Sequence, residues 1–222
     1  MVYFEKSQPA PTSLAEEKKK KSGTYRTTEV IEKINIDFSS KCYICEQKQP
    51  TTINVEHFLA HQNNIDLKFD WNNLFYACGH CNNVKLADEK FNNILNCTLG
   101  SDNVDTAIAY KFNPFPKEKP CFEVLISSEK AENTKEFLDK VFNGVHTDLK
   151  TLEGANLRDL LLKSIKEFQE LLIEYYKYDK DEHTLMKIKT HLNKTIVFTT
   201  FKRYIIRNNE DLNQEFANYI IN

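Results

Sequence analysis

The sequence has no large excess of charge of either sign, because 30 Lys and Arg stand against 32 Asp and Glu. The formal net charge of −2 excludes a histone-like protein that binds nucleic acid with its whole surface, although a local basic face remains possible. No apolar run approaches the roughly 20 residues that a membrane-spanning helix needs. No apolar segment follows a basic one near the start, as it would in a secretory signal. We therefore expect a cytoplasmic protein without a membrane partner.

Export signals, internal repeats and low-complexity tracts are all missing from the sequence. In such a chain, six cysteines are more often thiols or metal ligands than a disulfide framework. The composition, 41% hydrophobic and 28% charged, is that of an ordinary soluble globular protein. The cysteines are therefore the first candidates for a functional site.

The chain divides into three regions by composition. Residues 1–40 are expected to form an N-terminal arm and a short helix. Residues 41–95 are predicted to form a compact unit rich in loops, with short strands, because residues 41–91 hold four of the six cysteines, the only tryptophan and three Asn-Asn pairs. Residues 96–222 are predicted to be mainly helical.

Helical spacing of apolar residues places individual elements within these regions. A short amphipathic helix is predicted within residues 25–41, and a further amphipathic segment within residues 183–207. Residues 121–126 are typical of a short strand. The longest helical pattern begins near residue 156 and consists of Leu157, Leu161, Ile165, Phe168, Leu172 and Tyr175 or Tyr176.

The run of four lysines at residues 18–21 has two interpretations. A run of like charges is usually a solvated segment. It is alternatively an arm that contacts phosphates and binds nucleic acid without reading its sequence.

Two Cys-x2-Cys pairs are the strongest motif in the sequence. Cys42 and Cys45 form the first pair, and Cys78 and Cys81 form the second. Four thiolates from two tight turns complete a tetrahedral site that suits Zn²⁺. A site with four cysteine ligands is closed, so this zinc is expected to be structural.

The remaining Cys and His residues near these pairs are given simpler roles. His80, inside the second pair, is a possible substitute ligand, but we expect it to be exposed to solvent. Cys97 and Cys121 have no partner by spacing, and we expect them to be ordinary small apolar residues.

The residues between the two pairs carry the chemical groups. Residues 53–58 alternate like a strand and end with Glu56 and His57 side by side. The segment Asp70-Trp71-Asn72-Asn73-Leu74 follows. Asn82 comes directly after the second pair, as the predicted N-cap of a helix that contains Lys85 and runs through residue 90.

In this order and spacing, residues 42–85 resemble the HNH endonuclease motif. The match runs C-x2-C, then EH at a strand end, then W-x-N-L, then C-x2-C-N-x2-K. The resemblance implies an α+β protein in which a ββα-metal (HNH) nuclease unit with a four-cysteine zinc site is embedded in a mainly α-helical chain. Asn82 stands where many members have His, and this oxygen ligand favours Mg²⁺ or Mn²⁺ as the catalytic ion.

The resemblance also implies a role for each site residue. His57 is the general base, since its ordinary pKa lies close to neutral pH. Glu56 and Asn82 hold one Mg²⁺ at the scissile phosphate, provided that the chain bends so that Glu56 reaches the ion. Asn73 fixes a loop and orients the His57 imidazole. Lys85 contacts a phosphate oxygen as a point charge.

Simpler roles compete with these assignments. His57 is alternatively a structural histidine, and Asn73 a turn former, with Asn72 as the other candidate at that place. We expect Trp71 to pack in the core and His61 to lie on the surface.

A second, more diffuse resemblance extends over the rest of the chain. Residues 4–7, residues 154–158 and the long helices after them are similar to a group of small bacterial HNH proteins. That group includes the HNH subunits of Septu-type and retron-linked anti-phage systems, which act with an ATPase partner. The resemblance implies that the helical half binds such a partner.

The expected function is thus an endonuclease that hydrolyses phosphodiester bonds in DNA. An RNA- or tRNA-cleaving nuclease is an alternative, since the site recognises a phosphodiester and not a sugar. A non-catalytic zinc module that binds protein or nucleic acid is the alternative from a different class. A pure scaffold has no need of Glu56, His57 and Asn82 in this arrangement.

Overall fold

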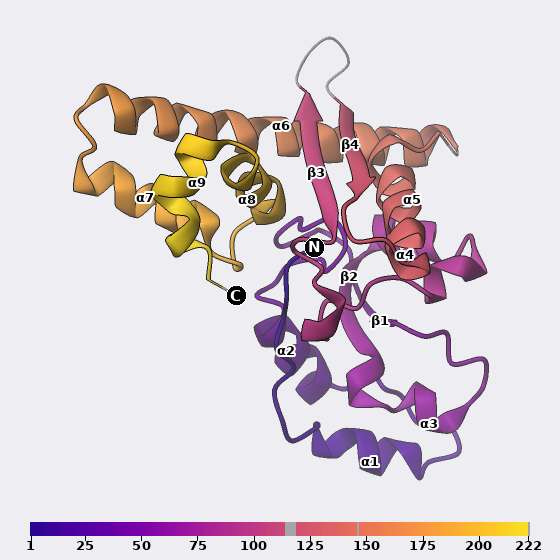
Figure 1. The fold of residues 1–222 in the computed structure, drawn as a ribbon. Helices are drawn as coiled ribbons and strands as arrows, with labels where there is room; N and C mark the ends of the chain where they lie inside the picture. Colours follow the sequence, from indigo (N-terminus) through magenta and orange to yellow (C-terminus); the bar gives the residue numbers. More distant parts are fainter. Residues whose placement is uncertain (114–118, 146, 222) are drawn as a thin grey trace.

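The computed structural model describes residues 1–113, 119–145 and 147–221 (Figure 1). It is a mixed α and β chain in which helices predominate, as predicted. The helices are α1 (Thr12–Lys18), α2 (Thr28–Asp37), α3 (Ile65–Lys68), α4 (Gly79–Lys85), α5 (Glu129–Asn143), α6 (Asp148–Lys177), α7 (Glu182–Leu192), α8 (Thr199–Arg207) and α9 (Glu210–Phe216). The strands are β1 (Ile53–His57), β2 (Leu74–Cys78), β3 (Ile108–Asn113) and β4 (Lys119–Val124).

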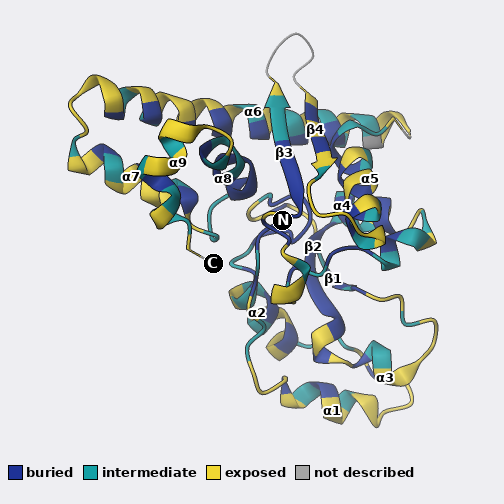
Figure 2. Cartoon of the chain, viewed as in Figure 1, coloured by how far each residue is buried: buried dark blue, intermediate teal, exposed yellow. Residues whose placement is uncertain are grey.

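Strands β1 and β2 form an antiparallel pair that leads directly into α4. Ile53 lies opposite Cys78 and His57 lies opposite Leu74. The predicted strand at residues 53–58 is confirmed, and every residue of β2 is buried (Figure 2). Cys78 and the start of α4 therefore lie at the Ile53 end of β1, and Lys85 in the last turn of α4 contacts Glu56 and His57 at the other end.

The start of α4 differs from the prediction. The N-cap is Cys78, whose sulfur accepts a hydrogen bond from the Cys81 amide at 3.4 Å. Asn82 therefore lies inside the helix and is not its cap. The helix ends at Lys85, and a short 3-10 turn over Glu89–Asn92 follows instead of further α-helix.

The first residues of the chain pack into the core, which corrects the expectation of an N-terminal arm. Met1, Val2 and Phe4 are buried, and the Phe4 ring lies 5.0 Å from that of Phe38 at the end of α2. Helix α2 confirms the predicted short helix, and it begins where the Thr27 hydroxyl caps the Val30 amide.

A buried charge cluster surrounds the N-terminal amine. The Met1 amine lies 3.2 Å from Glu46, and Lys41 lies 3.3 Å from the same carboxylate. Burial of Glu46 works against its ionisation, but the two cations and hydrogen bonds from Thr200 lower the pKa of Glu46 to about 2. Since Thr200 belongs to α8, this cluster joins the first residue of the chain to that helix.

The C-terminal region contains a hairpin of two strands, of which the sequence predicted one. Strand β4 confirms the predicted strand, shifted toward the N-terminus, and it pairs with β3, which was missed. Helix α5 packs against β4 and was also missed. Helix α6 begins at Asp148, a full two turns before the predicted start near residue 156.

The predicted helix at residues 183–207 is two helices. Helix α7 ends at Leu192 and α8 begins at Thr199, because Phe198 between them adopts a left-handed conformation with φ of 51°. The break turns α8 back so that Phe201 packs on Tyr110 of β3, with ring centroids 5.1 Å apart. Among the described residues, no helix is both long enough and apolar enough to cross a membrane.

A buried ion pair fixes α8 against the chain that enters β3. Arg203 is fully buried, and its Nη1 donates to Oδ2 of Asp105 at 2.9 Å. Arg207 donates to the same oxygen at 2.6 Å, and Arg203 Nε donates to the Leu192 carbonyl at 2.9 Å. Removal of the carboxylate would break this buried ion pair of Arg203.

We therefore expect Asp105→Ala to lower the free energy of unfolding by about 3–5 kcal/mol, the typical cost of breaking a buried ion pair. Urea denaturation followed by circular dichroism measures this loss. The control is Asp159→Ala on the exposed face of α6, for which a change of no more than about 0.5 kcal/mol is expected. Equal losses in the two variants would contradict the role assigned to Asp105.

Candidate metal centre and cleft

Four buried cysteines meet at the junction of three segments. Cys42 and Cys45 come from the turn after α2, Cys78 from the end of β2 and Cys81 from the first turn of α4. Their four sulfur atoms lie within 4.8 Å of one another, and those of Cys45 and Cys78 are 3.8 Å apart. A tetrahedral zinc ion with Zn–S bonds of about 2.3 Å separates its sulfur ligands by about 3.8 Å. The cluster therefore fits the predicted structural zinc.

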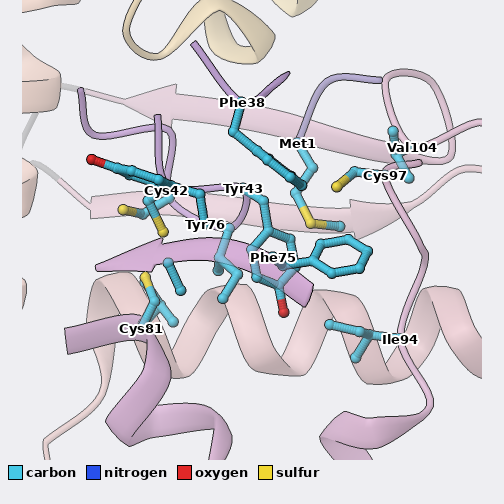
Figure 3. Packing of buried hydrophobic residues seen from close by; sticks show 14 of the residues in the cluster. Met1, Phe38, Cys42, Tyr43, Phe75, Tyr76, Cys81, Ile94, Cys97 and Val104 are labelled. Atoms are coloured by element: carbon cyan, nitrogen blue, oxygen red, sulfur yellow. The ribbon is translucent and has the colours of Figure 1, made fainter. Parts of the chain in front are cut away.

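The cysteine cluster lies in the wall of the main hydrophobic core. Figure 3 shows Cys42 and Cys81 among Tyr43, Phe75 and Tyr76. All four sulfur ligands are enclosed by this packing, so that no position is open to a substrate. A closed site of this kind stabilises the fold and leaves the chemistry to other residues.

His80 is neither a metal ligand nor exposed, which corrects the expectation from sequence. Its Nε2 lies 2.8 Å from the Val141 carbonyl of α5, and its Nδ1 lies 3.0 Å from a Glu153 carboxylate oxygen of α6. Both ring nitrogens thus contact oxygen acceptors, and only 11% of the side chain is exposed. His80 ties the second cysteine pair to the helical region.

The other two cysteines differ from each other. Cys97 is fully buried, as expected of a small apolar residue, whereas Cys121 is exposed on β4.

A cleft of about 420 Å³ opens between β1 and α4 and the segments around them. Four of the predicted site residues line it, namely Glu56, His57, Asn82 and Lys85. Its remaining wall comes from the segment before α2, from the loop after β1 and from the turn after α4; the lining residues there include Tyr25, Arg26, His61, Asp88, Glu89 and Asn92. The cleft therefore brings together groups from distant parts of the sequence.

The His57 imidazole is held in one orientation. Its Nε2 lies 3.0 Å from the carbonyl oxygen of Lys68, which can only accept a hydrogen bond, so that Nε2 carries the proton. In the neutral ring, Nδ1 is then the acceptor. The rings of Tyr25 and His61 contact His57 edge-on, at centroid distances of 4.4 and 4.7 Å. Burial lowers the pKa of His57, which keeps the ring neutral at neutral pH.

Asn73 holds the loop that positions His57. Its Oδ1 accepts from the Leu59 amide at 2.7 Å, and its Nδ2 donates to the carbonyls of Leu59 and Leu67 at 2.9 and 3.1 Å. The loop from Leu59 to the Lys68 carbonyl is thereby closed at its base. Asn72, the other candidate, is exposed and pairs with Gln8 at 3.4 Å.

Lys85 does not face a phosphate site, because its ammonium is already surrounded by oxygen atoms. Its Nζ lies 2.6 Å from Glu56 Oε1, and it donates to the carbonyls of His57 and Phe58 at 3.0 and 2.6 Å. Three acceptors use the three protons of the ammonium. Lys85 is therefore the counter-ion of Glu56, which corrects its predicted role as a phosphate contact.

Glu56 is buried and keeps one free oxygen. Its Oε1 accepts from the Tyr43 hydroxyl at 3.0 Å in addition to Lys85, whereas the buried Oε2 has no hydrogen-bond partner among the described residues. Burial raises the pKa of Glu56, and the Lys85 ammonium opposes this effect. Glu56 and Asn82 line the same cleft, and a carboxylate and an amide oxygen are ligand types that suit Mg²⁺ or Mn²⁺.

Sequence reasoning did not place Tyr25, Arg26 or His61 in this site. Tyr25 and Arg26 lie far from the motif in sequence, and no local pattern links them to His57. His61 lies four residues after His57, and this spacing in a loop predicts no contact between the two rings. The sequence therefore favoured a surface position for His61.

No family model matches this sequence, and no curated protein matches it either. The resemblance of residues 42–85 to a nuclease motif therefore depends on the motif residues and their geometry alone.

The metal centre gives a direct prediction. Cys78→Ser should lower the bound zinc from one ion per chain and reduce the thermal stability, since structural zinc contributes directly to folding. Mass spectrometric metal analysis and a thermal melt measure the two effects. Cys121→Ser, which changes an exposed thiol, should retain both zinc and stability. Zinc bound equally by both variants would contradict the assignment.

The buried Lys85–Glu56 pair predicts strong energetic coupling. Lys85→Met should cost about 3–5 kcal/mol because it leaves a buried carboxylate unpaired, and the double variant with Glu56→Gln should recover most of this loss. Urea denaturation of the two single variants and the double variant measures the coupling. The exposed pair Lys111–Glu123 serves as a control, with an expected coupling of about 1 kcal/mol or less. Simple additivity at Lys85 and Glu56 would refute the pairing.

Proposed function

We propose that this protein is a metal-dependent endonuclease of the HNH type, which hydrolyses phosphodiester bonds in DNA. The observation that carries the proposal is the cleft in which an oriented neutral imidazole lies beside a buried carboxylate with one free oxygen. The order of elements supports it, because a strand pair followed by a helix presents these groups at one end of β1 and on α4.

Hydrolysis of a phosphodiester requires two things of a site. The substrate is an anion that repels a nucleophile, so a base must take a proton from the attacking water. The leaving alkoxide is poor, so positive charge must be placed where negative charge develops. A neutral base and a cation site next to each other meet both requirements.

His57 is the proposed base. The Lys68 carbonyl occupies Nε2, which leaves Nδ1 as the atom that accepts the proton from water. The pKa lowered by burial keeps this acceptor unprotonated at neutral pH. Asn73 acts indirectly, since it closes the loop that carries the Lys68 carbonyl.

Glu56 and Asn82 are the proposed ligands of Mg²⁺ or Mn²⁺. When bound, the ion supplies the charge that stabilises the leaving oxygen. Glu56 offers its Oε2 for this purpose while Oε1 stays with Tyr43 and Lys85. Lys85 thus holds the carboxylate through Oε1, the oxygen that is not the proposed ligand.

The alternative of a non-catalytic zinc module does not account for the cleft. A scaffold needs neither an imidazole with a fixed tautomer nor a buried carboxylate that costs free energy to keep charged. The choice of DNA over RNA, the role in anti-phage defence and the ATPase partner remain part of the proposal through the resemblance alone.

His57→Ala tests the proposal most directly. It should lower the rate of plasmid nicking in Mg²⁺ or Mn²⁺ by roughly 100- to 10,000-fold, the usual contribution of a general base. Agarose gel electrophoresis of supercoiled plasmid measures the rate, and zinc content and the thermal melt should stay close to those of the unmodified protein.

The matched control is His183→Ala on the exposed face of α7, which should cleave like the unmodified protein. Cleavage retained in His57→Ala would refute the assignment of the base. Identical inactivity of all three proteins on DNA and RNA would favour the zinc module.

A further inference from the structure

Residues 19–26, which we call the basic strap, run from the end of α1 into the wall of the cleft. Tyr25 and Arg26 line the cleft, and the Tyr25 ring contacts His57. Lys19 and Lys21, at the other end of the strap, are exposed. The strap therefore connects an exposed basic turn with the proposed base.

The strap has a defined conformation. The Thr24 amide donates to a Glu17 carboxylate oxygen at 2.9 Å, and Lys68 Nζ donates to the Gly23 carbonyl at 3.1 Å. Gly23 packs so closely on α1 that an added Cβ would lie 1.9 Å from the Glu17 carbonyl oxygen. The turn is therefore built against α1 and tied by Lys68 to the loop that holds His57.

Three cations of the strap have no counter-ion in the described structure. Lys18 pairs with Asp66 at 2.6 Å and Lys20 pairs with Glu17, whereas no ion pair is formed by Lys19, Lys21 or Arg26. Exposed, unpaired cations keep their full attraction for an anion. The strap thus carries three cations without an ion-pair partner among the described residues, one of them, Arg26, in the wall of the cleft.

The turn after α4 brings acidic residues to the wall of the cleft. Asp88 and Glu89 lie there, and Asp88 is partly neutralised by Lys90 and Lys140, at 3.5 and 3.3 Å. An anionic strand would be repelled from this wall and drawn to the strap. The charge difference therefore defines the side on which a substrate backbone lies.

We propose that the basic strap binds the phosphate backbone of duplex DNA through Lys19, Lys21 and Arg26 and so guides the strand into the cleft beside His57. This inference rests on the proposed nuclease function. The contacts are electrostatic and independent of base sequence, and they place a local basic face on a chain that is nearly neutral overall.

Binding of DNA by cleavage-deficient protein tests the strap. All variants carry His57→Ala, and the probe is a short fluorescein-labelled DNA duplex titrated at several salt concentrations with anisotropy as readout. The strap variant combines Lys19→Gln, Lys21→Gln and Arg26→Gln. The charge-matched control combines Lys163→Gln, Lys166→Gln and Lys187→Gln, which change exposed cations of α6 and α7.

The strap variant should bind the duplex at least tenfold more weakly than the parent. The slope of log K against log salt should also decrease in magnitude by about one unit for each lost phosphate contact, or about three in all. The control should bind like the parent, and all three proteins should melt alike. Equal weakening of DNA binding in both triple variants would refute the role of the strap, while leaving DNA binding by the protein established. Failure of the parent to bind DNA, with plasmid cleavage by unmodified protein also absent, would overturn the proposed function and the strap together.

Discussion

Four buried cysteines bring three separate pieces of the chain to one point, and the candidate site depends on this junction. The turn after α2, the end of β2 and the first turn of α4 meet there, with sulfur spacings that suit one zinc ion. The junction lies opposite the start of β1, and it positions β2 and α4, which contact Glu56 and His57 at the far end of β1 through the strand pairing and Lys85. A strand pair of this length has little stability alone, so a zinc cross-link at its Ile53–Cys78 end would stabilise the pairing.

The interior of the cleft combines two kinds of polar group that are costly to bury. The ammonium of Lys85 is enclosed by Glu56 and two backbone carbonyls, while the imidazole of His57 is oriented by the Lys68 carbonyl and two neighbouring rings. Such an arrangement persists only when most of its atoms have partners. Oε2 of Glu56 is the exception, since this buried oxygen has no hydrogen-bond partner in the described part of the chain.

The surroundings of this cleft come from parts of the chain with no motif of their own. The strap carries Tyr25 onto His57, and Asn73 closes the loop that holds the Lys68 carbonyl. His80 joins the second cysteine pair to α5 and α6. A few side chains thus connect the candidate site and the cysteine pair to the rest of the chain. The residues next to them in sequence form no pattern that predicts these contacts.

The sequence by itself determined the cysteine pairs, the strand that ends in Glu56 and His57, and the amphipathic helices α2 and α6. These features follow from local spacing, since two cysteines in one turn and apolar residues three or four apart need no distant partner to be recognised. Only the tertiary structure decided that Lys85 neutralises Glu56, that Tyr25 reaches His57 and that the N-terminus is buried beside Glu46. Each of these contacts joins residues far apart in the chain, and its formation depends on burial and charge compensation in the folded protein, which a local pattern does not encode.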